Sequence, residues 1–210
     1  MADPRTAFRR SPLFHRRPLE GEGSAVRIAE RPFGGKFFIL RADAEEAVER
    51  LRAALGLGLP FDPLTSATQG ETSLLWLGPD EWMLVTAQGE AEERADKARA
   101  ALAGMHHQLV DVSDQYTVIE VVGPRARDLL MKLTTLDLHP RAFRPGMVAG
   151  SVFGRANALL WLPLGGDEEA FRLFVRWSMA DYMWCVIADA GREWGVPEEF
   201  PVKGERLTIA

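Results

Sequence analysis

The sequence predicts an α+β fold built from two repeated units, each made of a strand, a helix, a hairpin and a second helix. Apolar residues alternate between strand-like and helix-like spacing along the chain, and the order of elements in the first half recurs in the second. The word Leu74-Leu75-Trp76-Leu77 also recurs as Leu159-Leu160-Trp161-Leu162, 85 residues later. Coincidence between short apolar words is the alternative, but the agreement in element order favours a repeat.

The first unit is expected to begin with the aromatic-rich strand 36–41. Asp43 stands where it can cap the next helix, whose apolar face starts at Ala44 and ends at Leu55. A Pro- and Ser-rich segment at 60–70 predicts a loop, and Gly78-Pro79-Asp80 predicts a hairpin turn. The expected elements are strand 36–41, helix 44–55, strands 72–77 and 81–86, helix 91–103 and strand 107–112.

The second unit is organised around residues 111–140. β-branched residues predict a strand at 116–122, which Gly123 interrupts. Pro124 suits the first position of a helix because its missing N–H is not needed there. The expected elements are strand 116–122, helix 124–133, strands 151–153, 158–162 and 171–175, and helix 178–190.

The predicted domain organisation has four parts: a basic N-terminal tail at 1–23, α+β units at 24–112 and 113–195, and a C-terminal tail at 196–210. A net charge of −5 gives no case for binding nucleic acid or an anionic membrane. The single cysteine, Cys185, fits a reducing compartment, and no apolar run is long enough to span a bilayer. We therefore expect a cytoplasmic protein.

The N-terminal tail carries five arginines against three acidic residues, and apolar residues lie between them. A mobile, solvated tail and a partner-binding segment are both consistent with this pattern, and a mitochondrial transit peptide is a third alternative. If the tail binds a partner, deletion of residues 1–17 should leave the fold intact and weaken assembly. The interface candidates in the tail are Arg9, Arg10, Phe14, Arg16 and Arg17.

No catalytic or metal-binding pattern emerges from the sequence. The four histidines lack the spacing of a zinc site, and there is no glycine-rich dinucleotide or phosphate loop. Cys185 lies in an apolar helix, which favours an inert buried thiol. Asp111 and Asp114 could form a carboxylate pair, although turn and capping roles are commoner at a strand end. The residues alone favour a protein without catalysis.

The final predicted helix carries apolar side chains over roughly 240° of its surface, more than one sheet can cover. Either another layer of this chain or a partner covers the excess. Ser178 and Asp181 have the spacing of a capping box. The helix pattern leaves both kinds of cover open. If a partner covers the excess, as the family resemblance described below favours, Tyr182 and Trp184 are interface candidates, and Trp184→Ala is expected to weaken assembly at little loss of stability.

Seven short sequence motifs, called words here, are distributed along nearly the whole chain, and their order is specific. They are Ser11-Pro12-Leu13, the stretch Leu77–Val85, Asp111-Val112-Ser113, the stretch Gly123–Leu130, Leu136-Asp137-Leu138-His139-Pro140, the stretch Phe171–Val175 and the stretch Ser178–Tyr182. In these words the sequence resembles the gamma subunit of heterotetrameric sarcosine oxidase, a family similar to the folate-binding aminomethyltransferase of the glycine cleavage system. The chain departs from the family at Asp114-Gln115, Thr134-Thr135, Trp177 and Met179.

The resemblance implies an aminomethyltransferase-like fold of two ferredoxin-like units with antiparallel sheets. It implies a non-catalytic assembly subunit of a flavin-dependent enzyme that demethylates sarcosine to glycine and passes the one-carbon unit to tetrahydrofolate. The alpha, beta and delta subunits would be its partners and would hold FAD, FMN, NAD, tetrahydrofolate and zinc. Two alternatives stay open: a free-standing folate-binding aminomethyltransferase, with Asp111 near the folate, and the same subunit role for another N-methyl amino acid.

Overall fold

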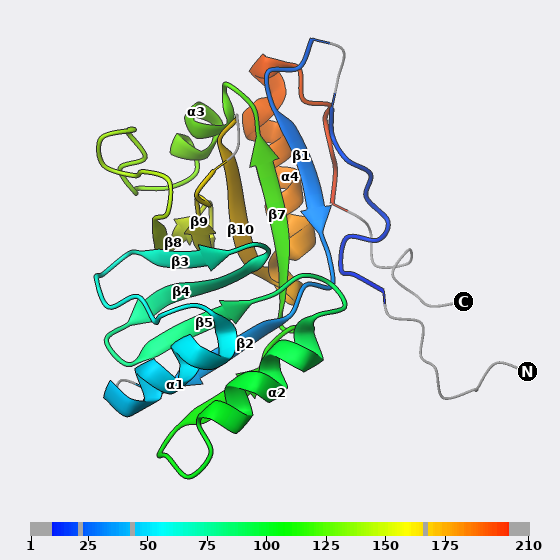
Figure 1. Cartoon of the computed structure of the whole chain (residues 1–210). Coiled ribbons are helices and arrows are strands. Elements are labelled where there is room, and N and C mark those ends of the chain that lie inside the picture. Colours follow the sequence, from blue (N-terminus) through cyan, green and yellow to red (C-terminus); the bar gives the residue numbers. More distant parts are fainter. Residues whose placement is uncertain (1–9, 21–22, 43–44, 166–167, 202–210) are drawn as a thin grey trace, which may run out of the picture.

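The computed structural model describes residues 10–20, 23–42, 45–165 and 168–201. These residues form two five-stranded antiparallel sheets with two helices against each (Figure 1). Sheet A has the order β1-β7-β10-β9-β8 and sheet B the order β3-β4-β5-β2-β6. The predicted α+β class with antiparallel sheets is confirmed.

The elements of sheet A and its helices come from both ends of the described chain. They are β1 (Arg27–Arg31), β7 (Tyr116–Val122), α3 (Ala126–Met131), β8 (Val148–Phe153), β9 (Ala156–Trp161), β10 (Ala170–Arg176), α4 (Ala180–Gly191) and the short 3₁₀ turns η1 (Trp177–Met179) and η2 (Arg192–Trp194). Sheet B is continuous in sequence. Its elements are β2 (Lys36–Leu40), α1 (Glu45–Leu55), β3 (Ser66–Gln69), β4 (Thr72–Gly78), β5 (Glu81–Val85), α2 (Ala91–Ala101) and β6 (Gln108–Asp111).

Three apolar clusters hold the layers together. Helices α1 and α2 cover one face of sheet B, and α3 and α4 cover one face of sheet A. A third cluster joins the opposite faces of the two sheets. Alternation along a strand sends Leu74 toward α1 and α2 and Leu75 toward sheet A. The layers therefore run helix, sheet, sheet, helix, with the two sheets facing each other.

The strand orders of the two sheets correspond position by position, which supports the internal repeat. In this correspondence β4 matches β9, and these two strands carry the repeated apolar words. The two sheets differ in where one edge strand comes from in the sequence. In sheet B this edge strand is β6, which follows α2, whereas in sheet A the equivalent edge strand is the N-terminal β1, paired antiparallel with β7. The N-terminal strand thus completes the second unit, so the sheets do not follow the expected division at residue 112.

Strands β1 and β3 are absent from the sequence expectation. Each is an edge strand, and each carries mostly polar or charged residues, as in the Ser66–Gln69 segment that was expected to be a loop. An edge strand buries one side at most, so it lacks the apolar run that identifies a central strand. The cap expected from Asp43 lies outside the described residues.

The start of α4 differs from the expected capping box. The chain enters α4 through η1, and neither Ser178 nor Asp181 caps a backbone N–H there. The Asp181 carboxylate instead accepts hydrogen bonds from Arg16 and lies 2.9 Å from His15 Nε2. The acidic residue that suggested a cap therefore anchors the N-terminal segment.

The N-terminal segment supplies the extra layer that α4 needs. Leu13 and Leu19 are buried in the same cluster as Trp184. In Figure 1 this blue segment runs beside the C-terminal stretch that follows α4. Trp184 is only 1% exposed, so the interpretation of Trp184 as a surface anchor is wrong: this chain itself covers the helix.

Arg127 ties α3 to the long loop that follows it. Its buried guanidinium donates hydrogen bonds to the carbonyls of Leu138 and Phe143 and pairs with Glu169. It also lies 5.0 Å from the ring centre of Phe171. The word around Gly123–Leu130 and the Leu-Asp-Leu-His-Pro word are thus joined by one side chain.

We expect Arg127→Met to lower the free energy of unfolding by about 3 kcal/mol, because it leaves carbonyls and a carboxylate without their donor. Urea unfolding of the isolated chain measures this. Arg125→Met is the matched control: Arg125 lies on the same turn but is exposed and pairs with Asp128, so its loss should amount to less than about 1 kcal/mol. Equal effects of the two substitutions would contradict the role given to Arg127.

Candidate functional site

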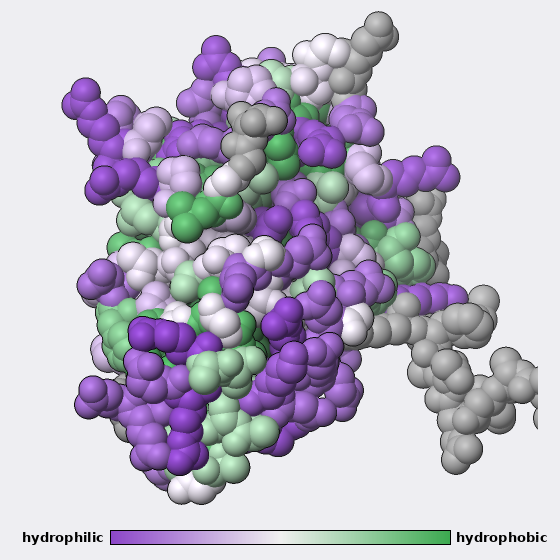
Figure 2. Space-filling view, in the orientation of Figure 1, coloured by the Kyte–Doolittle hydropathy of each residue, from purple (hydrophilic) through white to green (hydrophobic). Residues whose placement is uncertain are grey.

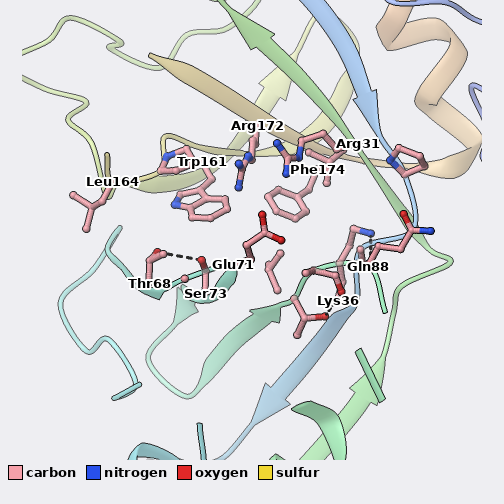
Figure 3. A pocket seen from close by; sticks show the side chains of 18 residues that line it. Arg31, Lys36, Thr68, Glu71, Ser73, Gln88, Trp161, Leu164, Arg172 and Phe174 are labelled. Atoms are coloured by element: carbon pink, nitrogen blue, oxygen red, sulfur yellow. Dashed lines mark hydrogen bonds between the residues drawn. The ribbon is translucent and has the colours of Figure 1, made fainter. Parts of the chain in front are cut away.

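A cavity of about 520 Å³ lies between the two sheets, and both sheets contribute to its walls (Figure 3). Arg31 reaches it from the end of β1 and Arg172 from β10, while Lys36 enters from the start of β2. Glu71 stands on the turn between β3 and β4, where Gly70 adopts a positive φ of 60°. This conformation suits glycine and turns the next side chain over the cavity.

One wall combines aromatic rings with a guanidinium. The centre of the Arg172 guanidinium lies 5.1 Å from the ring centre of Trp161, which in turn is 6.4 Å from the ring of Phe174. The indole N–H of Trp161 donates to Ser66 Oγ at 3.1 Å. Because Trp161 and Phe174 also belong to the cluster between the sheets, this wall is fixed by core packing.

Arg31 and Arg172 share one carboxylate beside the cavity. Glu120 Oε2 accepts hydrogen bonds from Arg31 Nη1 at 3.0 Å and from Arg172 Nε at 3.1 Å. Burial, and then repulsion from Arg31, lower the pKa of Arg172 below its usual value, while Glu120 and Glu71 partly oppose this shift. One carboxylate thus serves two guanidinium groups.

The floor of the cavity is polar and buried. Lys36 is 1% exposed, and its Nζ donates to the carbonyl of Gly34 at 2.8 Å. Ser73 and Thr86 are also buried, and the Ser73 hydroxyl lies 3.1 Å from that of Thr68. Such a surface suits a hydrophilic, negatively charged molecule.

Asp111, the candidate for folate, lies elsewhere. Its carboxylate accepts the backbone N–H of Ser113 at 2.8 Å, which is the turn role that its position suggests. It borders a separate cavity of about 200 Å³ beside Asp96 and Arg99 on α2. Within the described part of the chain, no group of three His, Cys, Asp or Glu side chains could hold a metal ion.

Three of the interface candidates are exposed in the N-terminal segment. Phe14 is 52% exposed, Arg10 is exposed and lies 5.3 Å from the Phe14 ring, and Arg17 is exposed. Arg9 lies outside the described residues. Arg10 precedes the buried Leu13 in the sequence, and Phe14 and Arg17 follow it. Leu13 fixes the segment to the core, so the three exposed side chains stand on an anchored backbone.

Arg16, by contrast, is used within the chain. It forms ion pairs with Asp181 and Glu199 and donates to the Phe200 carbonyl at 2.8 Å. Burial disfavours its charge, but the hydrogen bond and charge of Asp181 outweigh burial, and the pKa of Arg16 is raised. Arg16 is therefore a structural clamp and does not face outward as an interface residue would.

Tyr182 and Cys185 also serve the fold. The Tyr182 hydroxyl accepts the backbone N–H of Arg155 at 2.9 Å, and it lies where a side chain on Gly154 would collide with it. Cys185 is buried beside Arg16, and burial raises the pKa of its thiol. This agrees with the inert thiol expected from the sequence.

The residues of the inter-sheet cavity escaped the sequence search. They come from strands and turns far apart in the chain and form no motif. The available signal was a charged residue in an otherwise apolar strand, such as Lys36 before Phe37 and Arg172 between Phe171 and Leu173.

None of the described helices is both long and apolar enough to cross a membrane.

Comparison with known proteins identifies the relatives of this chain. The model of the family described as sarcosine oxidase, gamma subunit family matches residues 41–193. The sarcosine oxidase subunit gamma of Arthrobacter sp is 35% identical, with 91% of this chain and 94% of the relative covered. The match thus extends over nearly the full length of both chains.

Two solved structures share the fold. A chain of heterotetrameric sarcosine oxidase from Corynebacterium sp. U-96, in complex with pyrrole 2-carboxylate, is 28% identical with a TM-score of 0.80, covering 92% of this chain and 100% of that chain. The glycine cleavage system aminomethyltransferase T from Bartonella henselae has a TM-score of 0.57 at 15% identity, covering 76% of this chain and 44% of that one, and shows likeness of fold alone. The aminomethyltransferase-like fold is therefore confirmed, and the chain belongs to the sarcosine oxidase gamma subunit family.

Proposed function

We propose that this chain is a non-catalytic structural subunit of a heterotetrameric, flavin-dependent sarcosine oxidase. The observation that carries the proposal is the match to a whole chain of heterotetrameric sarcosine oxidase, covered to 100% of its length. The assembled enzyme would demethylate sarcosine to glycine and pass the one-carbon unit to tetrahydrofolate.

In this proposal the alpha, beta and delta subunits are the partners and hold FAD, FMN, NAD, tetrahydrofolate and zinc. The proposal is supported by the sequence, which lacks a dinucleotide-binding glycine pattern and zinc-ligand spacing. The single free cysteine, Cys185, supports a cytoplasmic location.

Purification of the chain with and without its partners tests the catalytic assignment. The isolated chain should show no flavin absorbance and should not oxidise sarcosine. The complex should show flavin absorbance and should oxidise sarcosine. A stoichiometric flavin bound to the isolated chain, or sarcosine oxidation by it, would disprove the structural role.

The N-terminal segment offers one surface for assembly. Leu13 and Arg16 hold the segment against α4 while Phe14 points outward between exposed cations. An exposed aromatic on a fixed backbone loses little conformational freedom on binding, as interface anchors require. We propose that Phe14, Arg10 and Arg17 contact a partner subunit.

We expect Phe14→Ala to weaken capture of the partner subunits about tenfold and to leave the stability of the isolated chain nearly unchanged. Quantitative pull-down with tagged chain, together with thermal unfolding, measures both effects. Phe61→Ala is the control, because Phe61 is exposed to a similar degree, 49%, but lies on the loop before β3. Unchanged capture by the Phe14 variant would exclude this segment from the interface.

A further inference from the structure

The inter-sheet cavity presents hydrogen-bond donors that the chain does not use. Within the described residues, Arg172 donates only from Nε, to Glu120, so its two terminal nitrogens remain available. Arg31 likewise uses Nη1 alone, again for Glu120. Figure 3 shows both guanidinium groups at one side of the cavity. Two planar donor groups at one wall match the geometry by which arginine holds a carboxylate or a phosphate.

The electrostatics of Arg172 also favour an anion. Arg31 and Arg172 share the carboxylate of Glu120. Burial, and then repulsion from Arg31, lower the pKa of Arg172, so within the described residues these effects outweigh the opposing charges of Glu120 and Glu71. An added anion would relieve this repulsion.

The size and surface of the cavity point to a small molecule. A volume of about 520 Å³ lies within the ordinary range of about 300–1,000 Å³ for ligand pockets. The buried floor of Lys36, Ser73 and Thr86 is polar, which favours an occupant with oxygens or other polar atoms over an apolar one. The core packing of Trp161 and Phe174 keeps the cavity preformed.

We propose that this cavity binds a small hydrophilic anion bearing a carboxylate or a phosphate, held by Arg172 and Arg31. Glu71 acts as a competing carboxylate at the mouth: it stands on an exposed turn, and Figure 3 shows it directed toward the two arginines. None of the residues that line the cavity belongs to the N-terminal segment proposed to contact a partner subunit.

Titration of the full chain with sodium phosphate and with sodium acetate tests the proposal, at constant ionic strength with chloride as the reference anion. Binding should change the tryptophan fluorescence, because Trp161 lies beside Arg172, and should raise the melting temperature. A response to phosphate alone identifies a phosphate-bearing ligand, and a response to acetate alone identifies a carboxylate. Both results support the site, whereas responses no larger than that to chloride would overturn it.

Three variants locate the response. Arg172→Gln should weaken binding about tenfold or more, since it removes charged donors, and Glu71→Gln should strengthen it by removing the competing carboxylate. Arg176→Gln is the matched control: Arg176 lies on the same strand and, four residues on, the same sheet face, but borders a different groove. Its affinity should equal that of the wild type.

A variant of the second arginine, Arg31, keeps the proposal testable if the Arg172 variant does not fold. Arg31→Gln lies on an edge strand, where the side chain is 48% exposed, so it should fold normally and weaken binding about threefold or more. Unchanged affinity in Arg31→Gln and in folded Arg172→Gln would overturn the proposal.

Discussion

Replacing Trp184 by alanine is expected to lower the free energy of unfolding of the isolated chain by about 3–5 kcal/mol. Trp184 is 1% exposed and packs in the cluster shared by sheet A, α3 and α4. Removing its ring leaves a cavity that neighbouring core residues can only partly fill. This expectation reverses the one drawn from the family resemblance, which placed the effect of the substitution in assembly.

Trp184→Phe separates packing from hydrogen bonding. The buried indole N–H of Trp184 has no acceptor among the described residues, so its removal sacrifices no hydrogen bond. The phenylalanine variant should therefore lose less than about half of what the alanine variant loses. Urea unfolding measures stability, and pull-down corrected for the folded fraction measures assembly. An alanine variant that keeps its stability but binds the partner subunits more weakly would show that Trp184 contacts a partner and does not support the core.

Deleting residues 1–17 should destabilise the isolated chain by about 3 kcal/mol. The deletion removes Leu13, which is 1% exposed in the core, and Arg16, which pairs with Asp181 and Glu199. The sequence alone predicts that the same deletion leaves the fold intact, because a basic terminal segment resembles a solvated tail. The structure gives the second half of that segment a structural role.

A shorter deletion provides the control. Removing residues 1–9 keeps Leu13 and the ion pairs of Arg16 with Asp181 and Glu199, so the melting temperature should stay well above that of the larger deletion. Leu13→Ala in the full chain should account for about 2–3 kcal/mol of the larger effect. Equal melting temperatures for both deletions would show that the segment contributes nothing to the fold.

The central strands and helices could be predicted because they bury continuous or periodic apolar faces. The strand expected at 116–122 has those bounds in the structure, and the repeat expected from Leu74 and Leu159 is matched by equivalent strand positions. β1 was not predictable in this way, because only Ile28 of its five residues is fully buried. Its pairing depends on a partner strand about ninety residues away in sequence, which no local pattern reveals.

The candidate site was less predictable than the fold. Arg31, Glu71 and Arg172 meet only because the two sheets face each other, and each alone resembles an ordinary surface charge. The wide apolar arc of α4 was visible in the sequence, but the residues that cover it, Leu13 and Leu19, lie more than 150 positions earlier. Long-range packing, which local periodicity does not encode, decided both questions.

The mass of the complex captured by this chain tests the central claim most directly. Tagged at one terminus and purified from the native source under mild conditions, the chain should elute with three other polypeptides. Native mass spectrometry should give a mass equal to one copy of each. Recovery of the chain alone at its own mass of 23.3 kDa, or only as a complex with copies of itself, would contradict the proposal that it is a subunit of a heterotetramer.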